Sequence, residues 1–170
     1  MDSHNRFERR SLRDVLVDQS VLTEELADEL MNSAREENEV FGAVVVESGH
    51  MTAWDLAKTV AVQYSMPHIP LSGFRYDGAL AENVPASTLH QYQVVPVGRF
   101  GRARSFAVVE PPTRACITAL SEACECSIFF FVAECTEVKR LLMEHVKVVD
   151  TSKDSSWQDI FDVANDSIGG

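Results

Sequence analysis

The first 64 residues carry one helical pattern twice, with a period of 29 residues, and this repeat constrains the fold more than any other feature. Residues of like chemistry coincide when the copies are aligned: Leu12 with Phe41, Leu22 with Met51, and Thr23 with Thr52. Each copy has a short apolar segment, a turn at Ser20 or Gly49, a threonine suited to cap a helix, and a longer segment. Two units are too few for a solenoid, so they must bury their apolar faces on each other and on later residues.

The longer segment of each copy has apolar residues every three or four positions, which is typical of an amphipathic helix. These are Leu26, Ala27, Leu30, Met31 and Ala34 in the first copy, and Leu56, Ala57, Val60, Ala61 and Tyr64 in the second. The sequence therefore predicts four helices. Pro67 ends this part, because proline disfavours helix at the residue before it.

After Pro67 the sequence predicts short strands and helices. We expect an edge strand over 68–71, a short helix over 84–91, a hairpin of strands 93–99 and 105–109, and a helix over 113–121. Residues 127–133 form a continuous apolar run, which favours a strand covered on both faces. The helix over 134–145 would supply one cover, with Val138, Leu141, Leu142 and His145 on one side.

The predicted fold class is α+β. A four-helix tandem-repeat subdomain (11–66) precedes a small α/β sandwich-like subdomain (67–147). A basic N-terminal arm (1–10) and a flexible acidic tail with a short amphipathic segment (148–170) flank them.

The net charge of −11 argues against binding to nucleic acid or to anionic membranes. Acidic residues dominate from Asp14 to Val60. This excess indicates either the solvated face of helices or a docking surface for a basic partner. No apolar run reaches the ~18 residues of a membrane span and no secretory signal begins the sequence, so we expect a cytoplasmic protein without membrane insertion.

The sequence offers no constellation for catalysis, and we expect no enzyme, no cofactor and no metal site. His68 and His90 have no nucleophile at an informative spacing. Nothing matches Gly-x4-Gly-Lys-Ser/Thr, the loop that holds nucleotide phosphates, so ATP hydrolysis is not expected. The four cysteines at 116, 124, 126 and 135 lack the spacing of common zinc sites and are expected to act as small buried apolar residues.

Several ordered motifs resemble a known family. Residues 40–52 read VFGAVVVESGHMT, and Leu56, Val60 and Gln63 follow at regular spacing. The later segments read YSMPHI (64–69), VP (84–85), YQVVPV (92–97) and VEP (109–111). This order is similar to the MshEN domain, the N-terminal domain of type II secretion and type IV pilus assembly ATPases. Its repeat has the form Arg-Leu-Gly, an apolar pair, a turn and Leu-x-x-x-Leu-x-x-Gln, present twice.

The resemblance implies a cytoplasmic regulatory or docking module, in some members a receptor for cyclic di-GMP. The first copy has Ser11, Arg13 and Ala34 where binding members have arginine, glycine and glutamine. The second has Val40 for arginine but keeps Gly42 and Gln63. The motif is thus degenerate, and the loss of two arginines argues against tight binding of an anionic ligand. The candidate ligand-binding residues are Arg13, Phe41, Gly42, Val45 and Gln63.

Two further segments have alternative interpretations. Trp157, Ile160 and Phe161 lie at helical spacing in the polar tail, and they either fold back on the body or anchor a partner protein. Arg99, Arg102 and Arg104 form either a solvated turn or a contact to an acidic partner or a phosphate. The tail itself is either the start of a linker to an ATPase or a free end.

Our preferred hypothesis is a non-enzymatic regulatory or adaptor module that docks on a protein partner, such as a secretion or pilus ATPase or another component of that machinery. Through its partners it would lie at the inner face of the cytoplasmic membrane. The alternative is a sensor domain for cyclic di-GMP or another nucleotide.

Overall fold

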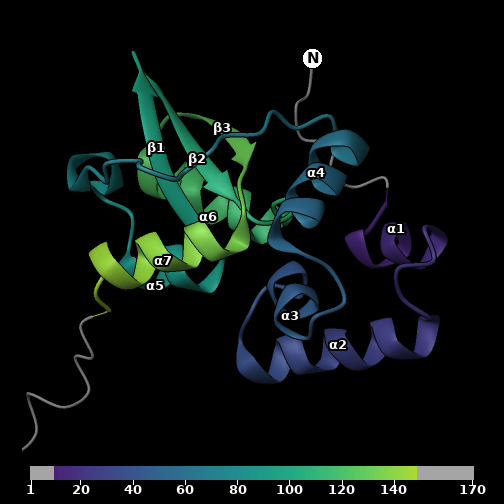
Figure 1. Ribbon diagram of the computed structural model, residues 1–170. Helices are drawn as coiled ribbons and strands as arrows, with labels where there is room; N and C mark the ends of the chain where they lie inside the picture. The colour runs from purple at the N-terminus through teal and green to yellow at the C-terminus, as the bar shows by residue number, and fades with distance from the viewer. Residues whose placement is uncertain (1–9, 149–170) are drawn as a thin grey trace, which may run out of the picture.

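The computed structural model describes residues 10–148, and its fold is α+β as predicted (Figure 1). The helices are α1 (Leu12–Asp18), α2 (Glu24–Glu37), α3 (Phe41–Glu47), α4 (Ala53–Tyr64), the 3-10 helix η2 (Gly78–Ala81), α5 (Ala86–Gln91), α6 (Arg114–Cys124) and α7 (Cys135–His145). The strands are β1 (Val94–Phe100), β2 (Ala103–Val108) and β3 (Ser127–Val132).

The repeat forms two copies of a short helix, a turn and a longer helix, which confirms the predicted pattern. The Thr23 hydroxyl accepts a hydrogen bond from the Leu26 N–H (3.3 Å), and Thr52 accepts one from Asp55 (3.1 Å). Each threonine satisfies one of the N–H groups that the first turn of a helix leaves without a partner. The turns before them contain Ser20 (φ 56°) and Gly49 (φ 77°) at equivalent positions.

The second half of the described chain is built on a three-stranded sheet in the order β1-β2-β3. β1 and β2 form an antiparallel hairpin, and β3 returns parallel to β2 after the crossover helix α6. α6 packs against β3, and α7 packs against β1 and β2, crossing in front of the sheet in Figure 1. The α3 and α4 helices of the repeat also contact α7.

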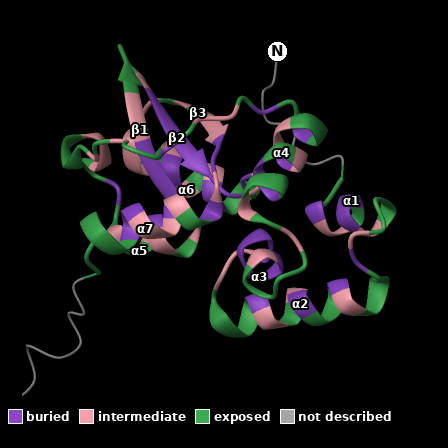
Figure 2. Ribbon diagram, viewed as in Figure 1, coloured by how far each residue is buried: buried purple, intermediate pink, exposed green. Residues whose placement is uncertain are grey.

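One apolar core runs through the repeat helices and the sheet. Its largest fully buried side chains come from both parts: Leu16 and Leu56 from the repeat, and Leu71, Leu89, Phe106, Leu120 and Leu141 from the rest. Figure 2 shows buried residues along the strands and on the inner sides of the helices. Within residues 10–148, no helix is long and apolar enough to cross a membrane.

Three local predictions were wrong. The expected edge strand over 68–71 is a single β-bridge from His68 to Val132. Pro67 and Pro70 flank this bridge and lack the N–H groups that a longer ladder requires. β3 is not covered on both faces, because Phe129 is exposed. His145 does not share the buried side of α7 with Val138, Leu141 and Leu142; it is exposed and stacks on Tyr76 with ring centroids 5.0 Å apart.

The cysteines follow the sequence prediction in part. Cys116 and Cys135 are buried, whereas Cys124 and Cys126 are half-buried, and all four are free thiols. Burial raises the pKa of the Cys116 thiol to about 12, which keeps it protonated at physiological pH. Among the described residues, no group of three or more His, Cys, Asp or Glu side chains is arranged to hold a metal ion.

Candidate functional site

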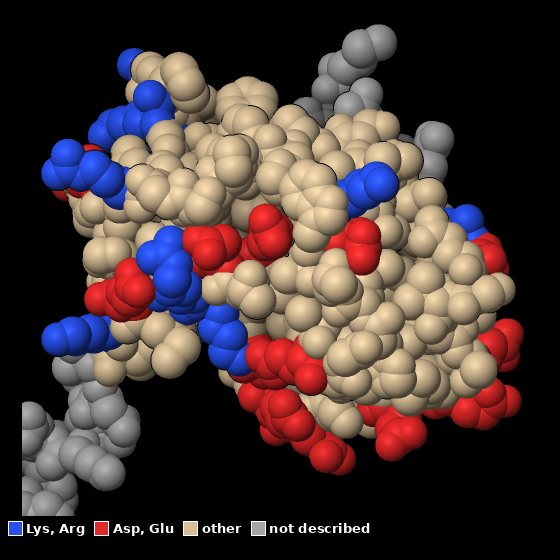
Figure 3. All heavy atoms as spheres, viewed as in Figure 1, with Lys and Arg blue, Asp and Glu red and all other residues tan. Residues whose placement is uncertain are grey.

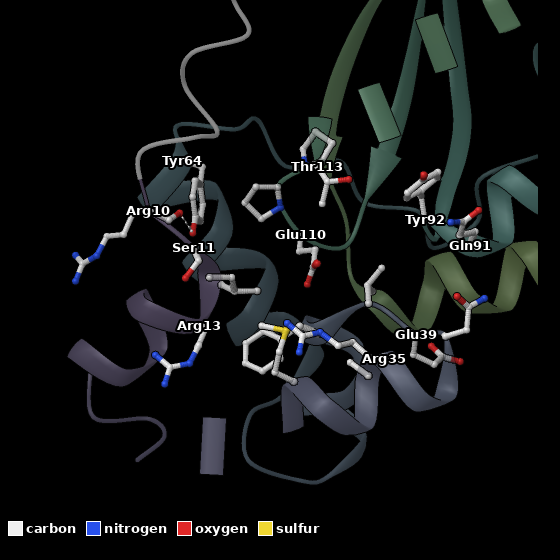
Figure 4. A pocket seen from close by; sticks show the side chains of 18 residues that line it. Arg10, Ser11, Arg13, Arg35, Glu39, Tyr64, Gln91, Tyr92, Glu110 and Thr113 are labelled. Carbon is white, nitrogen blue, oxygen red and sulfur yellow. Dashed lines mark hydrogen bonds between the residues drawn. The ribbon is translucent and has the colours of Figure 1, made fainter. Parts of the chain in front are cut away.

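A cavity of about 570 Å³ lies between the repeat and the sheet-containing part (Figure 4). The start of α1, the end of α2 and the α2–α3 loop form one side of it, and residues 110–113 form another. Ser11 and Val40, the two positions where the family resemblance places arginine, both line this cavity. The structure thus brings the first residues of both repeat copies to one hollow.

Glu110 connects the two parts of the protein at this cavity. Helix α3 begins after Val40, which has no side-chain oxygen to cap it. The Glu110 carboxylate follows strand β2 and accepts a 2.7 Å hydrogen bond from the Gly42 N–H in the first turn of α3. A carboxylate is favourable here because the N-terminus of a helix carries a partial positive charge. Glu110 therefore caps α3 from a distant part of the chain.

The surroundings of Glu110 are dense, although the residue keeps some exposure at the cavity wall. Burial raises the pKa of the Glu110 carboxyl to about 7, and the Gly42 hydrogen bond opposes this shift only in part. Tyr64 lies nearby and donates a 2.9 Å hydrogen bond from its hydroxyl to the Arg10 carbonyl. Burial, with the Glu110 charge as a smaller cause, raises the pKa of Tyr64 to about 12.

Three arginines line the cavity, and two of them are bound by carboxylates, whereas Arg35 makes only a 3.5 Å contact with the Asn32 side-chain oxygen among the described residues. Arg13 donates from Nε to Asp28 (2.7 Å) and from Nη1 to Asp14 (3.2 Å), and these hydrogen bonds raise the pKa of its guanidinium. Arg10 forms an ion pair with Asp18. A ligand that uses the positive charge of Arg13 or Arg10 must therefore compete with these carboxylates.

The candidate ligand residues lie in different environments. Arg13 and Phe41 line the cavity, and the Gly42 amide is bound by Glu110. Val45 is fully buried in the core. Gln63 is exposed and lines a separate hollow of about 250 Å³ with Gln19 and Lys58. The structure brings Arg13 and Phe41 together and leaves Gln63 outside this cavity.

Gly42 has a steric reason to be glycine. A β-carbon at this position would come within 3.0 Å of Leu56 Cδ2, 3.2 Å of Glu110 Oε2 and 3.4 Å of Leu12 Cδ2. The close approach of α1, α4 and Glu110 to the first turn of α3 therefore depends on the missing side chain.

A second polar cluster joins the α2–α3 loop to α7 beside the cavity. The buried Gln93 donates from Nε2 to Glu39. Lys139 on α7 lies 3.3 Å from Glu39 and 2.5 Å from Glu47. Lys139 thus joins α7 to the repeat region, and Gln93 joins the residue before β1 to the α2–α3 loop.

The arginines of the hairpin and the apolar residues of the tail are the remaining candidate residues. Arg104 is buried and donates a 2.5 Å hydrogen bond to the Glu82 carbonyl, so it does not belong to a solvated turn. Arg99 and Arg102 are exposed near the tip of the β1–β2 hairpin. The three tail residues Trp157, Ile160 and Phe161 lie outside the described residues.

Sequence reasoning missed Glu110 and Tyr64 at the cavity. One signal was available for Glu110: a predicted helix beginning after Val40 has no capping side chain of its own, which indicates that another residue must supply one. Sequence spacing alone does not say which residue that is.

Comparison with known proteins agrees with this architecture. The family model of the MshEN domain matches residues 64–150. A structure of MshE with cdg (cyclic di-GMP) superposes with a TM-score of 0.57 at 20% identity, covering 81% of this chain and 99% of that chain. Two crystal forms of the N-terminal domain of XpsE give TM-scores of 0.60 and 0.54 at 17% identity. They cover 84% and 80% of this chain and 97% of each of those chains. No curated protein matches the chain in sequence.

Proposed function

The chain belongs to the MshEN domain family, and we propose that it acts as a non-enzymatic docking module of a secretion or pilus assembly system. In this role it binds a protein component of that machinery in the cytoplasm and is held at the inner face of the membrane through that partner. The module comprises the repeat subdomain (11–66) and the α/β subdomain (67–147), and it uses no cofactor.

The observation that carries this proposal is the Glu110 carboxylate on the Gly42 amide. Ser11 and Val40 supply no positive charge to the cavity, and Glu110 adds a negative one when it ionises. Each charge-assisted contact to a ligand phosphate is worth about 1.5–3 kcal/mol, so losing two of them lowers affinity more than tenfold. The two missing arginines and the Glu110 carboxylate therefore weaken binding of an anionic dinucleotide, and Arg10 and Arg13 at the same cavity are already paired with aspartates.

The acidic surface of α2 is the proposed docking face. Its exposed acidic residues are Glu24, Glu25, Asp28, Glu29, Glu36 and Glu37. Figure 3 shows acidic side chains gathered over the lower right of the molecule, where α2 lies in Figure 1. A concentrated negative surface favours a basic partner by increasing the association rate and excluding acidic ones.

The docking proposal is tested by measuring binding of the full chain to purified ATPases and other cytoplasmic components of the secretion or pilus system of the same organism. A Glu25→Lys/Glu29→Lys variant reverses charge on α2, and a Glu82→Lys/Glu122→Lys variant makes the same change on exposed residues elsewhere. We expect the first pair to weaken binding at least tenfold more than the second. Equal effects from both pairs, or no binding by the wild type, would contradict the docking role.

The second candidate function is a sensor of cyclic di-GMP. The cavity volume, the aromatic side chains of Phe41 and Tyr92 at its wall and the MshE structure with cdg favour it. Calorimetric titration with cyclic di-GMP, with ATP and GMP as controls, separates the two functions. The docking role predicts flat heats. Micromolar binding that weakens in an Arg13→Ala variant would instead support a sensor with an altered motif.

A further inference from the structure

Two large aromatic side chains are exposed on one face of the sheet. Phe100 near the hairpin tip is 77% exposed, and Phe129 on β3 is 59% exposed. Gly98 pairs with Ser105, which in turn pairs with Phe129, so these residues follow one another across the three strands. A β-carbon on Gly98 would lie 3.7 Å from the Phe100 ring. We call Phe100, Gly98, Ser105 and Phe129 the aromatic shelf.

The shelf continues a sheet face that is covered elsewhere. Val95 and Ala107 are paired with each other farther along the same two strands, and both are fully buried. Phe129 and Phe100 lie toward the hairpin end of the sheet and keep most of their ring surface in water. Two exposed aromatic rings on one sheet face of a small protein indicate a surface that another chain segment covers.

Positive charge gathers at the hairpin tip, next to the shelf. Arg99 and Arg102 are exposed beside Phe100, and within residues 10–148 neither forms an ion pair with a carboxylate. Figure 3 shows Lys and Arg side chains at the upper left, where the hairpin tip lies in Figure 1, far from the acidic side of the molecule. The segment that fits here must therefore combine apolar anchors with carboxylates.

The sequence that follows the described residues has this combination. Its apolar residues repeat at helical spacing: Trp157, Ile160, Phe161, Ala164 and Ile168. Its charged residues are nearly all acidic: Asp150, Asp154, Asp159, Asp162 and Asp166, against Lys153. We propose that residues 150–168 of the same chain dock on the aromatic shelf, with Trp157 and Phe161 on the two rings and the net negative charge of the segment near the positive charge of the hairpin tip.

The connection is long enough for this contact. Trp157 lies nine positions after Val148, a distance of up to about 30 Å when the chain is extended. Helix α7 ends three residues before Val148 and packs against β1, whose seven residues are about 23 Å long. Two other large exposed apolar side chains, Trp54 and Met143, suit an acidic segment less well, because Asp55 follows the first and Glu144 the second.

Fluorescence of Trp157 tests the proposal in the full chain. The sequence has only two tryptophans, so a Trp54→Phe background makes Trp157 the single reporter. Docking predicts blue-shifted emission and weak quenching by acrylamide. A Phe100→Ser/Phe129→Ser variant and an Arg99→Glu/Arg102→Glu variant should each increase quenching several-fold. Met143→Ser, a change at an equally exposed apolar residue away from the shelf, should not.

A second variant tests docking without any change to the sheet, so misfolding of the sheet cannot explain its result. Asp159→Lys/Asp162→Lys alters only the docking segment and should also release Trp157. Three results would overturn the proposal: a fully quenched Trp157 in the wild type, protection unchanged by all shelf variants, or protection that disappears on dilution. If protection disappears on dilution and sedimentation shows a dimer, the shelf binds residues 150–168 of a second copy of the chain.

Discussion

The Glu110 carboxylate accepts a 2.7 Å hydrogen bond from the Gly42 N–H, across 68 residues of sequence. Glu110 follows the last strand of the hairpin, and Gly42 lies in the first turn of α3. This contact joins the repeat helices to the sheet at the cavity lined by Ser11 and Val40, the two positions where the family resemblance places arginine. Its strength depends on the protonation of one carboxyl group, which makes the connection between the two parts sensitive to pH.

Replacing Glu110 with Gln should remove a pH dependence of stability. The pKa of the folded Glu110 is raised from 4.5 to about 7, so the unfolded chain releases a proton between these values while the folded chain retains it. The free energy of unfolding of the wild type should therefore fall as pH rises from about 4.5 to 7, relative to Glu110→Gln. This relative decrease in the free energy of unfolding should reach about 2–3 kcal/mol. Urea denaturation at pH 4.5, 6 and 8 measures it, and parallel pH profiles would contradict the raised pKa.

A Gly42→Ala substitution should destabilise the protein by about 1–3 kcal/mol, because the new methyl group meets Leu56, Leu12 and Glu110 in a packed core. Gly78→Ala is the matched control, since nothing lies within 4 Å of a β-carbon at Gly78. Chemical denaturation of both variants provides the comparison. If both lose the same stability, steric crowding is not the reason for glycine at position 42.

The repeat could be predicted from sequence because its determinants are local. Thr23 and Thr52 lie three residues before the amides that they cap, so the pattern of a cap followed by an amphipathic segment is visible in the chain itself. The family model matches only from residue 64 onward, whereas the structural likeness to MshE extends over 81% of the chain. Helical periodicity thus predicted the part of the fold that the family model does not match.

The site could be predicted only in part, because its contacts are non-local. A carboxylate from the end of the hairpin caps a helix in the repeat, and no spacing rule connects the two. The exposure of Phe129 was missed for a similar reason. A continuous apolar run predicts a buried strand, but burial depends on how far the covering helix extends over the sheet.

Lys139→Gln should cost more stability than Arg140→Gln at low salt. Lys139 on α7 contacts Glu39 and Glu47 of the repeat region, whereas Arg140 pairs with Glu137 and Glu144 of its own helix. We expect a loss of about 0.5–1.5 kcal/mol for Lys139→Gln and less for Arg140→Gln. We expect urea denaturation to show a smaller difference in the free energy of unfolding between the two variants at high NaCl than at low NaCl, because salt screens the charges. If this difference does not change with salt, packing of the Lys139 methylene groups, and not the charge of Lys139, would explain it.

Exchanging the turn residues of the two copies should give effects of opposite sign. Ser20 (φ 56°) and Gly49 (φ 77°) both have left-handed backbone conformations, which cost a residue with a β-carbon roughly 1 kcal/mol. Ser20→Gly removes this cost but gives the unfolded chain more freedom, so a net gain of about 0.5 kcal/mol is expected. Gly49→Ser should lose a similar amount. Asn38→Gly, at a left-handed helix end where asparagine is already tolerated, should gain less than Ser20→Gly. Thermal unfolding of the three variants in one buffer ranks their stabilities. If Ser20→Gly is destabilising, the side chain of Ser20 must stabilise the turn by more than its left-handed backbone costs.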